Sequence, residues 1–185
     1  MSRYVSTAAG ESTKGRDMDQ TATQGSAHLT QSASTETSRF LIFSLNLEQY
    51  AVPLLKVKEV IALTEITPVP YSPPHFKGIM NLRGQVISVV DLRLKLKMSQ
   101  AQVSQETAII ILDLGYLSLG IIVDSVESVL AVANGEVQPP PDVGGANTSY
   151  IKGVVRKDKK LILLLEIEHV LSVEDLKAAR GTQAG

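Results

Sequence analysis

The side chains that most often carry out chemistry are sparse in this 185-residue sequence. Its three histidines (His28, His75 and His169) stand far apart, and no HxH or HExxH spacing places two imidazoles together for zinc. No cysteine is present, which removes thiolate chemistry and disulfides. GxSxG, Walker-type and GxGxxG patterns, which would supply a nucleophile elbow or a phosphate-binding loop, are also absent. We therefore expect that this protein is not an enzyme and that it has neither catalytic nor cofactor-binding residues.

Three carboxylates, Asp91, Asp124 and Glu166, are the remaining candidates for metal ligands. Asp91 follows an apolar run and precedes Leu92, the place where a helix N-cap is expected. Glu166 occupies the corresponding place in a second copy of the same pattern. A structural role therefore explains these residues better than metal binding does, and we expect no metal site.

Charge is nearly balanced, at −1 overall with 20% charged residues. Nucleic acids and anionic membranes bind basic faces, so neither is an expected partner. The basic run 156–160 contains Asp158, which favours a solvated hairpin tip over an anion site. No apolar run reaches about 18 residues and the N-terminus lacks a signal-peptide core, so we expect neither a membrane span nor export. A reducing cytoplasm agrees with the absence of cysteine.

The chain is organised around residues 68–96, PVPYSPPHFKGIMNLRGQVISVVDLRLKL. Its prolines exclude a regular helix or central strand at the start. Residues 81–85 are then predicted to form a hairpin turn leading into the β-branched strand 86–90, which should be buried on both faces.

Part of this stretch is repeated later in the chain. Lys77-Gly78 matches Lys152-Gly153, and residues 86–92 match 161–167, a shift of 75 positions. Earlier segments match with shifts of 69 and 71, including Val57 and Val60 with Val126 and Val129. Because the shift only grows along the chain, a duplicated unit with small loop insertions is favoured over chance similarity.

The remaining elements complete two similar halves. Residues 1–38 are polar and predicted to be disordered, 39–176 form the folded domain with halves 39–98 and 107–176, and 177–185 form a short tail. Residues 98–106 are a Gln-rich linker, and 142–149 a loop insertion. A helix is expected over 170–180, with Ser172 and Asp175 as its capping box.

About ten short strands and few helices indicate a mostly β protein built from two small barrels. A strand can then face its own barrel on one side and the other lobe on the other, which explains the continuous apolar runs. A single β-sandwich is the alternative.

Several blocks of the sequence resemble the bacterial CheW family. They include Leu55-Lys56-Val57-x-Glu59-Val60, Asn81-Leu82-Arg83-Gly84, Val90-Asp91-Leu92-Arg93, residues 120–126 (GIIVDSV) and Tyr150-Ile151-x-Gly153, spread over about residues 39–176. The resemblance implies two SH3-like barrels with a short C-terminal helix. It also implies a cytoplasmic, non-enzymatic adaptor that joins chemoreceptor tips to the histidine kinase CheA in arrays beneath the inner membrane.

The resemblance also implies roles for particular residues. A groove between the barrels, which receives the receptor tip, would be lined by Val57, Glu59, Arg83, Val126 and Val129. Gly78 would lie at the kinase contact. Glu59 and Arg83 have opposite charges in apolar surroundings, so we predict that they form an ion pair.

Two other functions remain open. The same coupling role could serve a chemosensory pathway that controls surface motility or development rather than flagella. A small β-barrel ligand-binding protein is the third reading, and a polar pocket lined by Asp91 and Asp124 would favour it.

Overall fold

The computed structural model describes residues 37–99, 102–140, 148–172, 175–176 and 179. The described residues belong to the second unit of the chain, Ser34–Gly185; the first unit, Met1–Ala33, and with it most of the segment 1–38 predicted to be disordered, lies outside the described residues. The first strand begins at Thr37, two residues before the predicted domain boundary, because Thr37 and Ser38 still pair with a neighbouring strand. Most of the predicted loop 142–149 and of the C-terminal tail also lies outside the described part.

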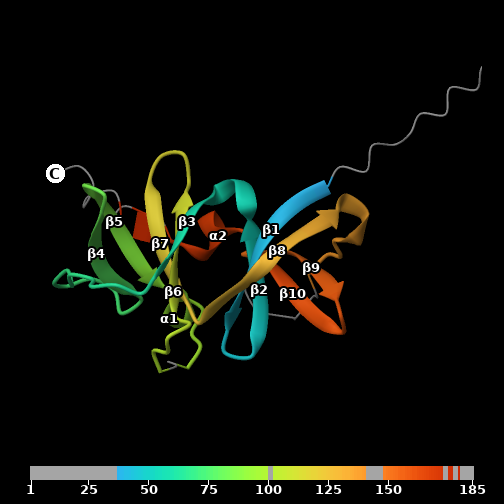
Figure 1. Cartoon of the computed structure of the whole chain (residues 1–185), viewed down its shortest axis with the longest axis horizontal. Coiled ribbons are helices and arrows are strands. Elements are labelled where there is room, and N and C mark those ends of the chain that lie inside the picture. Colours follow the sequence, from blue (N-terminus) through green and yellow to red (C-terminus); the bar gives the residue numbers. More distant parts are fainter. Residues whose placement is uncertain (1–36, 100–101, 141–147, 173–174, 177–178, 180–185) are drawn as a thin grey trace, which may run out of the picture. The chain divides into compact units, whose positions relative to one another are not determined.

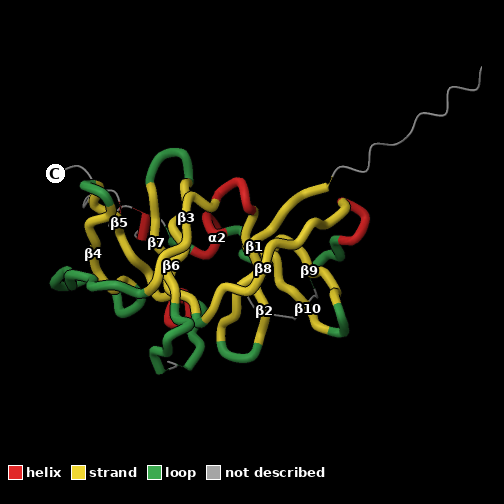
Figure 2. Tube along the Cα trace, in the orientation of Figure 1, coloured by secondary structure: helices red, strands yellow, loops and turns green. Residues whose placement is uncertain are grey.

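Ten strands and four short helical segments make up the described part of the second unit (Figures 1 and 2). In chain order they are β1 (Thr37–Leu45), β2 (Glu48–Pro53), the 3-10 helix η1 (Leu54–Lys56), β3 (Val57–Ala62), β4 (Phe76–Leu82), β5 (Gln85–Asp91), α1 (Leu92–Lys95), β6 (Ala108–Asp113), β7 (Ser118–Val123), β8 (Ser125–Ala133), the 3-10 helix η2 (Asn134–Glu136), β9 (Ile151–Lys157), β10 (Lys160–Leu165) and α2 (Ile167–Val170).

The strands form two five-stranded sheets with the same internal order. One sheet runs β8-β1-β2-β10-β9 and the other β3-β6-β7-β5-β4. In each, one pair of neighbours is parallel and the rest are antiparallel. Single bridges, Thr67 to Ile79 and Gln138 to Val154, bring the segment after each edge strand back to the opposite end of its sheet. The predicted mostly β fold of two barrel lobes is confirmed.

The duplication seen in the sequence is confirmed by the strand register. In one sheet Gly78 faces Val89, which faces Gly120; in the other, Gly153 faces Leu164, which faces Ala51. Shifts of 75 and 69 positions therefore relate not only the residues but also their pairing partners. The strands β5 and β10, which contain the apolar runs 86–90 and 161–165, occupy equivalent places, as predicted.

The two lobes are not the two halves of the sequence. β1 and β2 pair with β8, β9 and β10, whereas β3, β4 and β5 pair with β6 and β7. The repeat thus exchanges the two sheets, as a twofold operation does. Consequently, the linker 98–106 joins two parts of one sheet. The chain passes between lobes at two other places, from β2 to β3 and from β7 to β8.

Three apolar clusters explain why the strands are hydrophobic on both faces. Each lobe has its own small core, one around Phe40 and Ile42 and the other around Ile109 and Ile111. The alternate residues of the same strands, such as Phe43 and Ile110, belong to a third and larger cluster shared by both sheets. The prediction that each strand faces its own barrel on one side and the other lobe on the other is confirmed.

Two local predictions need correction. The hairpin turn predicted for 81–85 contains only Arg83 and Gly84, because both adopt positive φ, as a tight two-residue turn requires. The helix predicted from Val170 does not start there, because Val170 ends α2 and Leu171 is extended. The Ser172–Asp175 capping box is present, with Ser172 N donating to Asp175 Oδ2 at 2.7 Å and Asp175 N to Ser172 Oγ at 3.2 Å.

Candidate functional site

An exposed apolar surface is formed by two equivalent edge strands, β3 and β8. Val57 and Val60 of β3 correspond to Val126 and Val129 of β8. Residues three apart on a regular strand point to opposite sides. Here each strand carries a β-bulge, at Lys58 in β3 and at Glu127 in β8, so the two valines of each strand return to the same side. We call these four residues the valine face.

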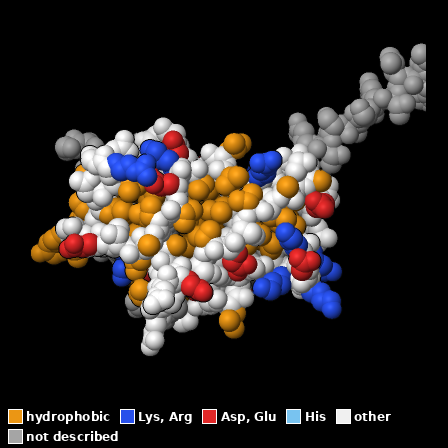
Figure 3. Space-filling model, in the orientation of Figure 1, with side chains coloured by type: hydrophobic (Ala, Val, Ile, Leu, Met, Phe, Trp, Pro, Cys, Tyr) orange, Lys and Arg blue, Asp and Glu red, His pale blue; other side chains and the backbone are white. Residues whose placement is uncertain are grey.

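The valine face combines anchoring with exposure. Val57 and Val126 are half-buried and pack against the cluster shared by both lobes. Val60 and Val129 are 41% and 48% exposed. Figure 3 shows hydrophobic side chains gathered between β3 and β8 on this side of the protein. A hollow of about 440 Å³ lies at its edge, lined by Glu106, Ala108, Ser125, Val126 and Glu127.

The predicted ion pair between Glu59 and Arg83 is present. Arg83 Nη2 lies 2.9 Å from Glu59 Oε2. Arg83 stands in the β4–β5 turn, and β3 and β4 are the two ends of their sheet. The pair therefore connects the two edges of the barrel. Arg83 is 80% exposed and Glu59 21%, so the pair contributes only about 0–1 kcal/mol to folding.

The five residues predicted to line one groove do not all lie on one side of the protein's strands. Val57, Val126 and Val129 share the valine face. Glu59 follows the bulge and alternates with Val60, so it points to the other side of β3, the side from which Ile61 packs into its own barrel. The charged pair thus borders the valine face at the end of one barrel.

Gly78 has a structural role that the sequence comparison did not reveal. Its φ is +136°, and a Cβ at this position would lie 2.0 Å from the carbonyl oxygen of Thr67. The close approach allows Thr67 and Ile79 to exchange backbone hydrogen bonds of 2.8 and 2.9 Å. Gly153 repeats the close approach but not the positive φ, since a Cβ there would lie 2.9 Å from Gln138 O and 2.4 Å from Val137 Cγ1. Gly78 is buried, and its lack of a side chain lets the Thr67 segment pair with β4.

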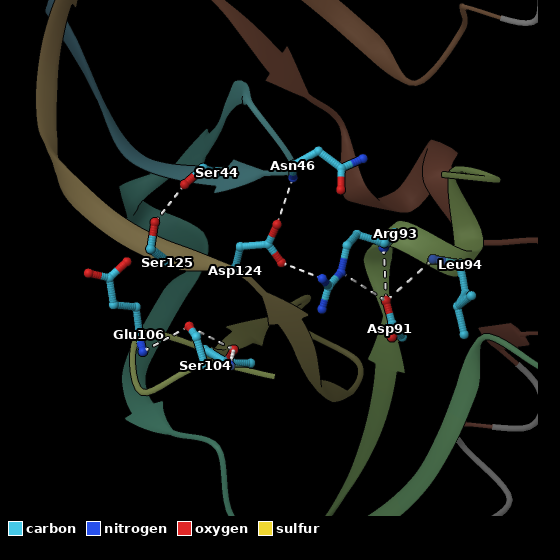
Figure 4. Close-up of polar contacts among 10 residues, drawn as sticks. Ser44, Asn46, Asp91, Arg93, Leu94, Ser104, Glu106, Asp124 and Ser125 are labelled. Carbon is cyan, nitrogen blue, oxygen red and sulfur yellow. Dashed lines mark hydrogen bonds and ion pairs between the residues drawn. The ribbon is translucent and has the colours of Figure 1, made fainter. Parts of the chain in front are cut away.

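The three carboxylates considered as metal ligands are engaged within the protein. Asp91 caps α1 as predicted, with Oδ1 accepting from Arg93 N at 3.0 Å and Leu94 N at 3.3 Å (Figure 4). Asp124 Oδ2 accepts from Asn46 N at 2.6 Å. Glu166 starts α2 without capping it. Among the described residues, no three His, Asp or Glu side chains form a group that could hold a metal ion.

Glu166 binds Lys56 instead. Lys56 Nζ lies 2.7 Å from Glu166 Oε1 and 2.6 Å from Glu168 Oε1. Burial alone would lower the pKa of Lys56, but the hydrogen bonds and charges of the two glutamates outweigh it and raise the pKa above its usual value. The hydrogen bond from Lys56 likewise lowers the pKa of Glu166, against the effect of burial. Lys56 and Glu166 are therefore held in their charged forms.

Two residues important for this site were missed by sequence reasoning. Val60 was absent from the predicted groove, although the duplication already paired it with Val129 and so contained the signal. Lys56 gave no signal, because its partners Glu166 and Glu168 are 110 and 112 positions away and only the fold brings them together. No helix among the described residues is long and apolar enough to cross a membrane.

Two interleaved five-stranded barrels with an apolar face on their equivalent edge strands, β3 and β8, define a mostly β protein of two SH3-like lobes. The family of CheW-like domains matches residues 39–175, and the chain therefore belongs to the CheW family.

Individual relatives agree with this assignment. The chemotaxis protein CheW of Klebsiella aerogenes is 32% identical over 143 residues, which cover 77% of this chain and 86% of the relative. Protein FrzA of Myxococcus xanthus is 27% identical, covering 75% of this chain and 88% of FrzA. The crystal structure of the scaffolding protein TtCheW from Thermoanaerobacter tengcongensis is 31% identical with a TM-score of 0.69, covering 76% of this chain and 96% of TtCheW.

Proposed function

We propose that this chain is a non-enzymatic adaptor that couples the cytoplasmic tips of chemoreceptors to the histidine kinase CheA in chemotaxis. It would act in the cytoplasm, in receptor arrays beneath the inner membrane. Membership of the CheW family supports this role, as do the chemotaxis and scaffolding names of its relatives. The observation that carries the proposal is the valine face, an apolar surface built by the same bulge on two equivalent strands.

The valine face has the properties of a protein-binding surface. Val60 and Val129 offer apolar area at the surface, while Val57 and Val126 fix the strands to the shared core. A protein interface needs an apolar centre, with charges at its rim to set orientation. The Glu59–Arg83 pair lies at such a rim. We assign the valine face and this pair to receptor binding, and the β4 edge shaped by Gly78 to kinase binding.

Binding experiments with purified partners test this function. Val129→Asp places a charge in the valine face and should weaken capture of a receptor cytoplasmic fragment about tenfold or more, because the charge must be desolvated on binding. The matched control is Val103→Asp, since Val103 is another exposed valine, at 68%, but lies in the segment before β6. Equal loss in both variants, or no capture of receptor fragment and CheA by the unmodified protein, would contradict the proposal.

A second candidate is the same coupling role in a pathway other than flagellar chemotaxis. It is retained because one relative is named Protein FrzA rather than CheW. Deletion of the gene, followed by separate assays of swimming and surface motility, distinguishes the two. The third reading, a ligand-binding barrel, loses its main support because Asp124 already binds Asn46 and Arg93, and Asp91 caps α1.

A further inference from the structure

The valine face begins where the chain crosses from one lobe to the other. The crossing from β2 to β3 runs through η1 and ends at Lys56, immediately before Val57. The crossing from β7 to β8 runs through Asp124 and Ser125, immediately before Val126. The position of each pair of valines therefore depends on how its crossing is held.

The first crossing is held by what we call the Lys56 cluster. Lys56 Nζ lies 2.7 Å from the carboxylate of Glu166 and 2.6 Å from that of Glu168. Glu166 immediately precedes α2, and Glu168 lies within it. All three side chains are between 25% and 30% exposed. No backbone group takes part in these contacts. Apart from the packing of Val57 against the shared cluster, the β3 side of the valine face is thus attached to the other lobe through a flexible lysine side chain that water reaches.

The second crossing is held by what we call the Asp124 cluster, shown in Figure 4. Asp124 Oδ1 lies 2.7 Å from Arg93 Nη1, its Oδ2 accepts from Asn46 N, and its own N–H donates to Ser44 O at 3.1 Å. Ser44 Oγ also lies 2.6 Å from Ser125 Oγ. Arg93 is only 2% exposed, so the cation of this cluster is shielded from water, whereas Asp124 is 22% exposed.

Burial makes the Arg93–Asp124 pair hard to break. Among the described residues, Nε and Nη1 of Arg93 have no aligned hydrogen-bond partner, so the guanidinium charge relies on Asp124 and on Asp91, 3.8 Å from Nε. Separating a buried pair leaves an uncompensated charge in a region of low dielectric constant, which costs far more than separating an exposed pair. The hydrogen bond from Asp124 N to Ser44 O adds an attachment that involves no side chain, and Asn46 N adds a backbone donor to the short Asp124 carboxylate.

The two clusters are equivalent in position and opposite in charge. A shift of 75 positions takes Arg93 of α1 to Glu168 of α2, and a shift of 69 takes the Asp124-Ser125 crossing to Leu55-Lys56. The cation is therefore on the helix in one cluster and on the crossing in the other. Both repeats keep an ion pair between helix and crossing, although they share none of its residues. The feature that the two repeats share is therefore an ion pair between helix and crossing, and not any particular residue.

We propose that these two clusters position the two sides of the valine face with unequal strength, so that β8 is fixed and β3 is the side that adjusts. Lys56 is then a positioning residue for Val57 and Val60, as Arg93 and Asp124 are for Val126 and Val129. Increasing salt should weaken the Lys56 cluster, in which the cation is 28% exposed, more than the Asp124 cluster, in which the cation is 2% exposed. The unequal strength of the two clusters follows from the structure alone, whereas its effect on receptor binding rests on the proposed function.

Methyl NMR of the free, full-length protein with labelled valines tests the unequal strength directly. The four valines provide matched probes, two on each strand. Raising NaCl from about 0.05 to 1 M, a range over which screening becomes strong, should shift the methyl resonances of Val57 and Val60 several-fold more than those of Val126 and Val129. Equal responses of the two strands, or no response in β3, would overturn the proposal.

Substitution of Lys56 tests its positioning role. Lys56→Met keeps the apolar stem but removes the charge, and should shift the β3 methyl resonances while leaving those of β8 in place. Lys56→Arg should restore them, because it keeps the charge. Lys160→Met, at the start of β10 and exposed, is the matched control and should affect neither strand. If Lys56→Met does not fold, the salt titration of the unmodified protein still decides the question.

The consequence for binding is measured with a receptor cytoplasmic fragment as the probe. Lys56→Met should weaken its affinity about fivefold, and Lys56→Arg should recover most of the loss. Unchanged affinity in Lys56→Met would show that the position of β3 does not matter for this partner. Failure of the unmodified protein to bind would reject the proposed function, while the salt titration would still report on the clusters.

Discussion

Single residues decide how the chain closes each barrel, and Gly78 is the clearest case. Two separate constraints act there: a positive φ, and the carbonyl oxygen of Thr67 at 2.0 Å from where a Cβ would stand. Gly84, in the β4–β5 turn, has a positive φ of +84° but open space around it. The two glycines therefore allow the steric and conformational costs to be separated.

We predict that Gly78→Ala destabilises the protein by about 3 kcal/mol or more, because the Thr67 segment must move away and its bridge to Ile79 is strained. Gly84→Ala should cost only about 1–2 kcal/mol, the penalty for an L-residue in the left-handed region. Urea unfolding of both variants measures the difference. If Gly78→Ala loses kinase binding while keeping its full stability, the buried glycine has a direct role in the contact instead.

At the same scale, the ion pair of Glu59 and Arg83 should affect recognition more than folding. Reversing either charge, with Glu59→Arg or Arg83→Glu, is expected to change the unfolding free energy by only about 0–1 kcal/mol, because Arg83 is largely exposed. Receptor coupling should weaken in each single variant and recover partly when both charges are reversed. Purely additive losses in the double variant would show that the two side chains act independently.

Residue-level features were predictable from sequence where their cause is local. The Asp91 cap and the tight turn at Arg83-Gly84 depend on neighbours within three positions, so sequence patterns contain them. The valine face was only partly predictable. The bulge that brings Val57 and Val60 to one side depends on pairing with β6, which no pattern within β3 specifies.

At the scale of elements, a buried carboxylate, Asp175, attaches the short segment after α2 to one barrel. Asp175 Oδ1 lies 2.5 Å from His75 Nε2, and Asp175 Oδ2 contacts Lys95 Nζ and accepts from Ser172 N. Burial would raise the pKa of Asp175, but these hydrogen bonds outweigh it and lower the pKa to about 2. The Ser172–Asp175 pattern was visible in the sequence, whereas the contacts to His75 and Lys95 required the fold.

The lowered pKa fixes the sign of the pH dependence. A carboxyl whose pKa is depressed on folding contributes its stability above the unfolded value of about 3.9 and loses it as pH falls toward 2. Asp175→Asn should therefore cost about 2 kcal/mol at pH 7 and make stability decline less steeply between pH 4 and 2. Asp158→Asn, in the exposed β9–β10 turn, is the control. Thermal unfolding from pH 2 to 7 makes the measurement, and parallel curves for Asp175→Asn and the unmodified protein would contradict it.

For the whole molecule, the sequence specified the number and type of strands but not which strands share a sheet. Two copies of one pattern, 39–98 and 107–176, fit equally well to two separate barrels or to two that exchange strands. The distinction depends on the crossings at Lys56 and Asp124. These crossings place β3 and β8 in sheets with partners from the other copy. The large cluster shared by both sheets then buries apolar residues of both lobes together.

This interleaving predicts that neither half of the chain folds alone. A fragment ending in the linker after Ser99 contains β1 to β5, which provide two strands to one sheet and three to the other. The complementary fragment contains β6 to β10 and has the same deficit in reverse. Each fragment alone would expose the apolar faces that normally meet in the shared cluster, so circular dichroism and NMR should show no cooperative unfolding and little chemical-shift dispersion. Mixing the two fragments should restore cooperative unfolding and chemical-shift dispersion, because every strand then regains its neighbours.

The control is the intact chain cleaved in the same linker, which should unfold in one transition. A cooperative unfolding transition in either isolated fragment would mean that the copies can form separate barrels, contrary to the strand exchange described here.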